Sequence, residues 1–243
     1  MRGFCLLGCK VGAKSSIMVS HIPDAIAHGA EIRTQSMAAE IVLDGRDRVR
    51  GVRYFRTLSD DGRWVAEEQR AKAVIVAGYA VETPRLLLNS TSAAFPDGLA
   101  NTNGLVGLFL MALAGPVVWG RFPWLIRQYK APPACALTEA FYETDRRNDF
   151  VRGYALQTVA PLPIAMAHLL IEEDGEYGER LLERMQDYNH YAAIGVLGEI
   201  LPDERNAISL HPTDKDQYGL PVPYSHFNLF DKPGVATTLG TDG

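Results

Sequence analysis

The residues best suited to bind a ligand lie at one predicted strand-to-helix turn. Residues 73–77 form an unbroken apolar run typical of a strand covered on both faces. Gly78 ends the run, and Thr83 and Pro84 are the candidate N-cap and first residue of a helix. The N-terminus of that helix would offer unpaired N–H groups and a partial positive charge to an anionic ligand. A plain strand-to-helix connection needs the same residue types, so both interpretations stay open.

Cysteine and histidine residues give weaker signals. Cys5 and Cys9 are spaced CxxxC without a second ligand pair nearby, which favours free thiols, or a disulfide under oxidising conditions, over a metal site. His190, beside Tyr188 and Asn189, is either a candidate base or a partly buried structural histidine at a helix end. Three other histidines show no convergent partner in the sequence: His168, His211 and His226. No GxSxG, HExxH or Walker sequence supports a hydrolase, a metalloprotease or a P-loop enzyme.

The first ninety residues predict a short helix followed by β structure. The helix is expected at residues 22–28, where Gly29 ends it. Strands are expected at residues 31–34, 37–43, 49–57 and 64–70. The last three alternate apolar and polar residues between turn sequences, which predicts a three-stranded meander with one solvent-facing side.

The second half of the chain predicts an α+β arrangement. Strands are expected at residues 117–122, 150–159, 192–201, 207–211 and 222–230, with the third and fourth paired through a turn at residues 202–204. Residues 176–191 read as an amphipathic helix. We therefore expect an antiparallel sheet with helices on one face.

Composition excludes several classes of protein. The 243 residues are 47% hydrophobic with a formal net charge of −5, so neither a disordered chain nor a nucleic-acid partner is expected. The longest uncharged apolar stretch, residues 105–119, contains glycine and proline and is shorter than the about 18–20 residues that a membrane-spanning helix needs. It is expected to be buried, with no membrane span. Three cysteines and an N-terminus without signal-peptide features favour a cytoplasmic location.

Ten short motifs in chain order resemble the middle of a glucose–methanol–choline (GMC) oxidoreductase. They include GCKVGAK at residues 8–14, ETPRLLL at 82–88, GLAN at 98–101 and DQYGLP at 216–221. Such enzymes oxidise alcohols or sugars with FAD, by hydride transfer to the flavin. The GCKxGAK segment is similar to that of gluconate and fructose dehydrogenase flavoprotein subunits.

The resemblance implies a fold, a cofactor and site residues. Residues 1–110 would form part of an α/β, Rossmann-like FAD-binding domain, and residues 111–243 an α+β substrate-binding domain, incomplete at its C-terminus. Ala38 would meet the adenine through its backbone, and Ala77, Gly78 and Thr83 would line the FAD site. The implied partners are a small alcohol, sugar or sugar acid as substrate and an electron acceptor.

The chain also departs from the family pattern. It has neither the N-terminal GxGxxG nor the C-terminal segment with the family's catalytic histidine, so no catalytic residue is assigned and an internal fragment is expected. Because the family places its base elsewhere, a structural role is expected for His190. Tyr79 stands at a family glycine and would crowd the cofactor, while Leu108 and Leu113 replace an arginine and a histidine. A non-catalytic remnant that does not bind FAD is therefore the alternative function.

Overall fold

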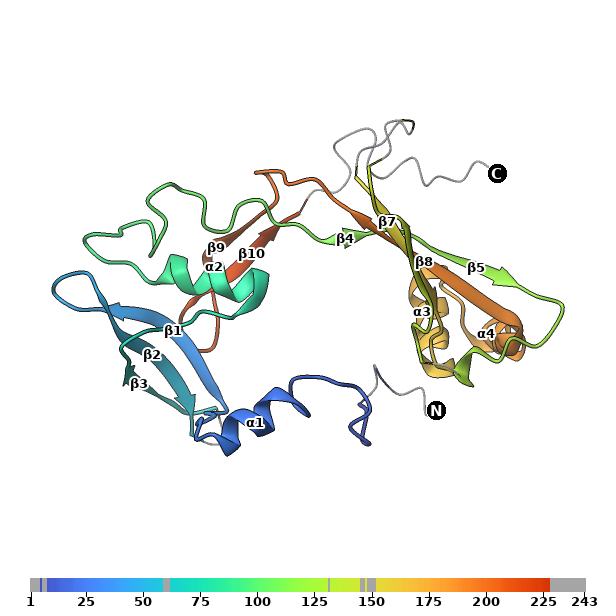
Figure 1. The fold of residues 1–243 in the computed structure, drawn as a ribbon, viewed down its shortest axis with the longest axis horizontal. Coiled ribbons are helices and arrows are strands. Elements are labelled where there is room, and N and C mark those ends of the chain that lie inside the picture. Colours follow the sequence, from blue (N-terminus) through green and yellow to red (C-terminus); the bar gives the residue numbers. More distant parts are fainter. Residues whose placement is uncertain are drawn as a thin grey trace. The chain divides into compact units, whose positions relative to one another are not determined.

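The structure, a computed structural model, describes residues 5, 8–58, 62–130, 132–144, 147 and 152–227 (Figure 1). The chain divides into two compact units. The first, here called the meander unit, contains Glu31–Met111 and the described part of Leu201–Asn228. The second, the sheet unit, contains Ala112–Ile200 and the described part of Met1–Ala30.

In the meander unit, β1 (Ser36–Leu43), β2 (Val49–Thr57) and β3 (Trp64–Arg70) form an antiparallel sheet in that order. Ala38 lies opposite Tyr54, which lies opposite Glu67 on the third strand. A bulge in β1 follows Ala38 and shifts the register before Glu40. The predicted meander is confirmed, because alternating apolar residues between polar turns bury one side of such a sheet.

Helix α2 (Tyr79–Asn89) packs against β1 in the same unit. The helix begins at Tyr79, four residues before the predicted N-cap, with Gly78 as its actual N-cap, and Pro84 lies inside it. The assignment of Thr83 as N-cap is therefore wrong. Its hydroxyl instead accepts a hydrogen bond of 3.1 Å from the Gly78 N–H, which satisfies a backbone donor at the start of the helix.

The meander unit is completed by the hairpin of β9 (Ala207–Lys215) and β10 (Pro221–His226). Both strands pack against α2. In the turn, the Tyr218 ring stacks on Phe55 at 5.3 Å between centroids and meets the edge of Trp64. The DQYGLP turn therefore docks on β2 and β3 through aromatic contacts.

The sheet unit contains a five-stranded antiparallel sheet. Its strands are β4 (Leu113–Ala114), β5 (Val117–Arg121), β6 (Leu137–Phe141), β7 (Tyr154–Val159) and β8 (Tyr191–Glu199). The order is β4-β8-β7-β6, with β5 also paired to β8. This unit also holds the 3₁₀ turns η1 (Gln128–Lys130) and η2 (Tyr188–His190) and the isolated helix α1 (His21–Ala27), which buries no residue.

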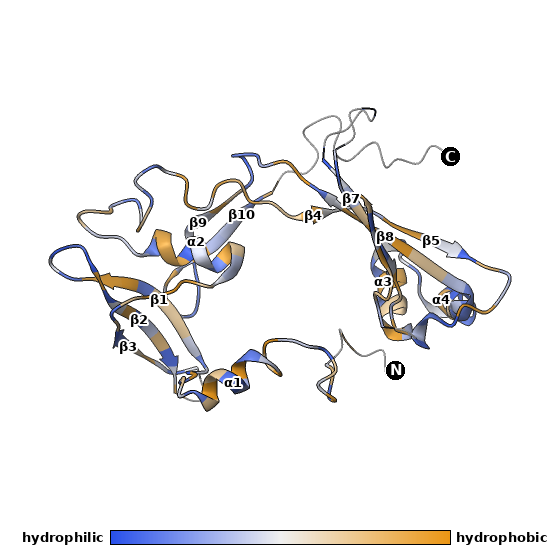
Figure 2. Cartoon of the chain, in the orientation of Figure 1, coloured by the Kyte–Doolittle hydropathy of each residue, from blue (hydrophilic) through white to orange (hydrophobic). Residues whose placement is uncertain are grey.

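Helices α3 (Pro163–Asp174) and α4 (Gly178–Gln186) pack on this sheet. Figure 2 shows α3 as mostly hydrophobic, whereas α4 is largely hydrophilic. The core consists of Met166, Leu170, Tyr188 and Tyr191, with Trp119, Leu181 and Met185 packed against it. The predicted antiparallel α+β arrangement is confirmed here, although β4, β6 and α3 were not predicted.

Some sequence predictions are wrong. Residues 31–34 do not form a strand, and the predicted pairing of residues 192–201 with 207–211 does not occur, because β8 pairs with β7 while β9 pairs with β10. Residues 105–119 are not a buried segment: Met111 is 56% exposed and Leu113 66%. The final predicted strand ends at His226, and residues 228–230 lie outside the described part of the chain.

The Rossmann-like part of the prediction is not confirmed. Residues 73–77 are extended but belong to no sheet in the part of the chain that the structure describes. A strand is defined by ladder hydrogen bonds to a neighbour, and among these residues the segment has none. No helix in the described ranges combines the length and the apolar character needed to cross a bilayer.

Candidate cofactor-binding site

Two adjoining concavities lie in the meander unit, and they share Ala38 and Val52. The first, here called the apolar pocket, has a volume of about 250 Å³ and is lined by Met37, Ala38, Val52, Val74, Ile75, Val76, Ala77, Gly78, Glu82 and Leu86. The second, the polar pocket, has a volume of about 450 Å³ and is lined by Glu31, Arg33, Ser36, Ala38, Val52, Tyr54 and Gln69. The two together form a site that is apolar at one end and polar at the other.

The structure brings together three of the four predicted cofactor-binding residues. Ala38, Ala77 and Gly78 line the apolar pocket. Thr83 does not line it, because its hydroxyl accepts the Gly78 N–H. Their role in binding FAD stays a prediction.

The wall formed by residues 74–78 is extended and incompletely bonded. Val74, Val76 and Gly78 are half-buried, whereas Ile75 is 92% exposed. This alternation is the period-two pattern of a strand. Within the described residues, the backbone of 73–77 makes no hydrogen bond to another segment. Its N–H and C=O groups can therefore pair with a ligand or with another strand.

Tyr79 does not crowd the apolar pocket. Its side chain is 68% exposed, and it lines neither of the two concavities. The backbone of Tyr79 has φ of +54°, in the left-handed region that favours glycine. The Tyr79 side chain therefore does not clash with a ligand in either pocket, and the cost of a non-glycine residue here is backbone strain at the start of α2.

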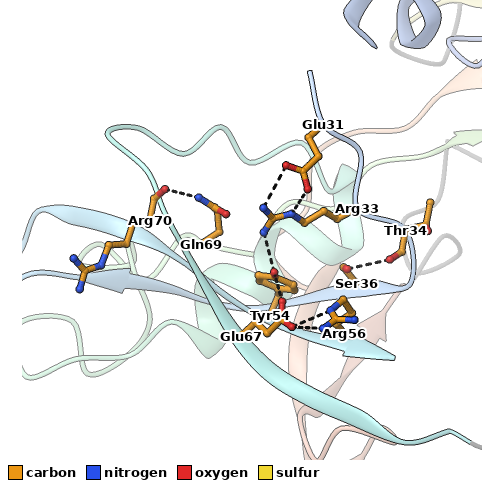
Figure 3. A network of polar contacts seen from close by, with 9 residues as sticks. All are labelled: Glu31, Arg33, Thr34, Ser36, Tyr54, Arg56, Glu67, Gln69 and Arg70. Atoms are coloured by element: carbon orange, nitrogen blue, oxygen red, sulfur yellow. Dashed lines mark hydrogen bonds and ion pairs between the residues drawn. The ribbon is translucent and has the colours of Figure 1, made fainter. Parts of the chain in front are cut away.

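A chain of polar contacts forms the wall of the polar pocket (Figure 3). The Arg33 guanidinium donates to both Glu31 carboxylate oxygens, at 2.7 and 3.4 Å, and to the Tyr54 hydroxyl at 2.8 Å. The Tyr54 hydroxyl donates in turn to Glu67 at 2.5 Å. Arg56 donates two hydrogen bonds to the other oxygen of Glu67. Tyr54 is buried, so it anchors this network to the sheet.

The same contacts fix the charges around the pocket. Hydrogen bonding to Arg33 lowers the pKa of Glu31, and hydrogen bonds from Arg56 and then Tyr54 lower the pKa of Glu67. The hydrogen bonds to Glu31 and then Tyr54 raise the pKa of Arg33 above its already high ordinary value. Two carboxylates and two guanidinium groups are thus charged at neutral pH, and they balance.

Sequence patterns did not single out Arg33, Tyr54, Glu67 or Gln69. The cross-strand pair of Tyr54 and Glu67 could have been found from the predicted strands, because β2 and β3 are consecutive in the chain and pair antiparallel. The position of Arg33 could not, because it precedes β1 in a segment without regular structure.

The other candidate residues lie elsewhere. His190 is half-buried, with Nδ1 3.1 Å from the Phe122 carbonyl oxygen, consistent with the expected structural role. Cys5, Cys9 and Cys135 are free thiols, and no cluster of three metal-ligating side chains occurs among the described residues.

Two of the histidines lie closer to other polar groups than the sequence indicated. His211 and His226 both pack edge-on against Tyr224, at 5.3 and 4.4 Å between ring centroids. His226 Nε2 also lies 3.0 Å from the Ser209 hydroxyl. The β9–β10 register therefore brings both histidines to the same tyrosine, a contact that the sequence alone does not reveal.

The site residues fit the adenosine half of FAD, the cofactor that the resemblance implies. Ala38 is exposed at the shared floor and leaves room above the sheet, and the extended wall has unpaired backbone groups. The polar pocket adds donors from the Gln69 amide and the Arg33 guanidinium. The described lining residues include no glycine-rich loop for the pyrophosphate.

Comparison with known proteins supports the same assignment. A family model described as GMC oxidoreductase matches residues 1–106. The chain is 31% identical to 2-methyl-1,2-propanediol dehydrogenase of Mycolicibacterium austroafricanum, over 98% of this chain and 43% of that protein. It is 26% identical to the fructose dehydrogenase large subunit of Gluconobacter japonicus, over 90% of this chain and 39% of that protein. The chain thus spans less than half the length of these relatives, and it belongs to the GMC oxidoreductase family.

Proposed function

We propose that this chain contributes to an FAD-dependent oxidoreductase that acts on the CH–OH group of an alcohol, a sugar or a sugar acid. Residues 1–110 would belong to the FAD-binding domain and residues 111–243 to the substrate-binding domain. The main support is the apolar pocket, in which Ala38, Ala77 and Gly78 meet although Ala38 is far from the other two in sequence. The two named relatives, a diol dehydrogenase and a fructose dehydrogenase subunit, are consistent with this substrate class.

The residues of this chain would bind and orient the cofactor. The backbone beside Ala38 and the extended wall at residues 74–78 would hold the adenosine half, while the apolar side chains exclude water from it. Bound FAD would supply the flavin ring that accepts a hydride from the carbinol carbon. We assign no catalytic base to this chain. An electron-acceptor partner and a cytoplasmic location belong to the same proposal.

A second candidate is a chain that neither binds FAD nor turns over substrate. It is favoured by the sequence, which has no GxGxxG to hold the pyrophosphate through backbone N–H groups. The two candidates differ in a property that is simple to measure.

The experiment is a titration of the purified chain with FAD, followed by the quenching of flavin fluorescence and by calorimetry. Saturable binding supports the first candidate, and a bound yellow chromophore absorbing near ~450 nm after gel filtration would strengthen it. A well-folded chain that leaves FAD fluorescence unchanged at all concentrations supports the second. Ala38→Trp, which fills the shared floor of the two pockets, should abolish binding by the first candidate.

A further inference from the structure

We infer that the Arg33 guanidinium forms a stacking wall for the adenine ring, and that Gln69 contacts the edge of the same ring. This inference rests on the proposed function, because it assigns residues of the polar pocket to one part of FAD. It is carried by the position of both side chains on the pocket that shares Ala38 with the apolar pocket.

The Arg33 guanidinium is held in one orientation. Three hydrogen bonds fix its plane, two to Glu31 and one to Tyr54. Its central carbon also lies 5.8 Å from the centre of the Tyr54 ring. A planar cation restrained in this way can stack on a flat aromatic heterocycle with little further loss of side-chain freedom.

The charge balance of the pocket favours a neutral ring over a phosphate. Arg33 and Arg56 are matched by Glu31 and Glu67 through direct ion pairs. Three of the five N–H groups of Arg33 are already used in these contacts. A phosphate would also meet the Glu31 carboxylate, whereas an uncharged base would not be repelled.

Gln69 gives the pocket a way to recognise adenine. Its amide nitrogen donates one hydrogen to the Arg70 carbonyl oxygen at 2.9 Å, which leaves a second N–H and the amide oxygen available. Adenine presents an acceptor at N7 beside a donor at N6, which is the pattern a glutamine amide matches. Val52, opposite Gln69 in the strand register, supplies an apolar floor between the two pockets.

The test compares AMP, FAD and FMN as ligands of the full chain, measured by calorimetry. AMP carries the adenine without a flavin, and FMN carries the flavin without an adenine. For Arg33→Ala we expect AMP and FAD affinity to fall roughly ten- to a hundredfold, the range seen when one base loses its stacking partner. FMN binding should not change. Arg33→Lys keeps the charge but not the plane, so it should behave like Arg33→Ala.

The matched control is Arg53→Ala. Arg53 stands beside Tyr54 on β2 and forms a comparable ion pair with Glu40, but it does not line the polar pocket. Its removal should leave AMP affinity within about twofold of the wild-type value. Gln69 lies outside the Arg33 hydrogen-bond network, and Gln69→Ala should also weaken AMP binding. This variant keeps the inference testable if the Arg33 variants do not fold.

The outcomes separate this inference from the proposed function. If FAD binds and Arg33→Ala or Arg33→Lys binds AMP as tightly as wild type, the inference is wrong and the proposed function stands. If AMP binds in an Arg33-dependent way but FAD does not, the inference holds and the proposed function fails. A loss of FMN affinity equal to that of FAD would place the flavin against Arg33 and overturn the inference. Absence of any binding would overturn both.

Discussion

Arg85 and Asp216 lie 131 residues apart in the sequence, yet Arg85 Nη2 donates to Asp216 Oδ2 at 2.7 Å. Arg85 is the arginine of ETPRLLL and Asp216 the aspartate of DQYGLP, two motifs recognised separately in the sequence. Arg85 also donates to the Pro221 carbonyl oxygen at 3.0 Å, and its side chain is only 7% exposed. The two motifs therefore form a single buried polar contact between α2 and the β9–β10 hairpin.

Replacement of Arg85 by methionine should strongly destabilise the meander unit. The change leaves the Asp216 carboxylate without its buried cation, a type of loss that costs about 3 kcal/mol. Urea unfolding followed by tryptophan fluorescence would measure it, because Trp64 contacts the same hairpin turn. Arg48→Met is the control, since that guanidinium is 71% exposed and its ion pair should add little. Equal unfolding midpoints for the two variants would contradict a structural role for the contact.

Replacement of Tyr79 by glycine should stabilise the chain. Tyr79 adopts φ of +54° with an exposed side chain, so glycine relieves strain and removes few contacts. The expected gain is about 0.5 to 1 kcal/mol after allowance for the greater freedom of glycine in the unfolded state. Thermal unfolding would measure the gain. Ala80→Gly, one residue later in α2, should instead cost about 1 kcal/mol. Destabilisation by both changes would show that Tyr79 is not strained.

Replacement of Gly107 by alanine should disrupt the contact between residue 107 and β9. A Cβ there would clash with the Ile208 carbonyl oxygen, and the Gly107 backbone has φ of +89°. We expect a loss of about 3 kcal/mol from overpacking and strain combined. Gly104→Ala is the matched control, because it has φ of +69° and open space around its Cβ position. Gly104→Ala should lower the free energy of unfolding by only about 1 kcal/mol. A similar loss of stability for the two variants would argue against the close approach of residue 107 to Ile208.

Acid should destabilise the meander unit in part through Glu67. Its pKa is lowered in the folded chain by hydrogen bonds from Arg56 and then Tyr54, so the contribution of this carboxylate is present above its unfolded pKa near 4.5. That contribution is lost as the pH falls below 4.5 and through the folded value. As the pH decreases, the free energy of unfolding of the Glu67→Gln variant should therefore fall less steeply than that of the wild-type chain.

The control for this pH effect is the same substitution in an Arg56→Met background. Arg56 supplies the largest part of the effect on Glu67, through two hydrogen bonds. Without it, Glu67→Gln should change the pH dependence of stability much less. Parallel pH profiles for wild type and Glu67→Gln would refute the assignment.

The sequence by itself determined the local elements and the family. Alternating apolar residues between turn sequences located β1, β2 and β3, because burial of one sheet face imposes a period of two. The motifs around Arg85 and Asp216 pointed to GMC oxidoreductases without any knowledge of their contact. Residues 73–77 show the limit of such patterns, since an apolar run predicts an extended segment but not the neighbour that would pair with it.

Only the tertiary structure decided which residues meet. The register of β1, β2 and β3, with the bulge after Ala38, placed Tyr54 between Arg33 and Glu67 and joined the two pockets at Ala38. The separate register of β9 and β10 brought His211 and His226 against the ring of Tyr224. These contacts depend on long-range strand pairing, and no periodicity along the chain specifies which distant polar groups that pairing will bring together.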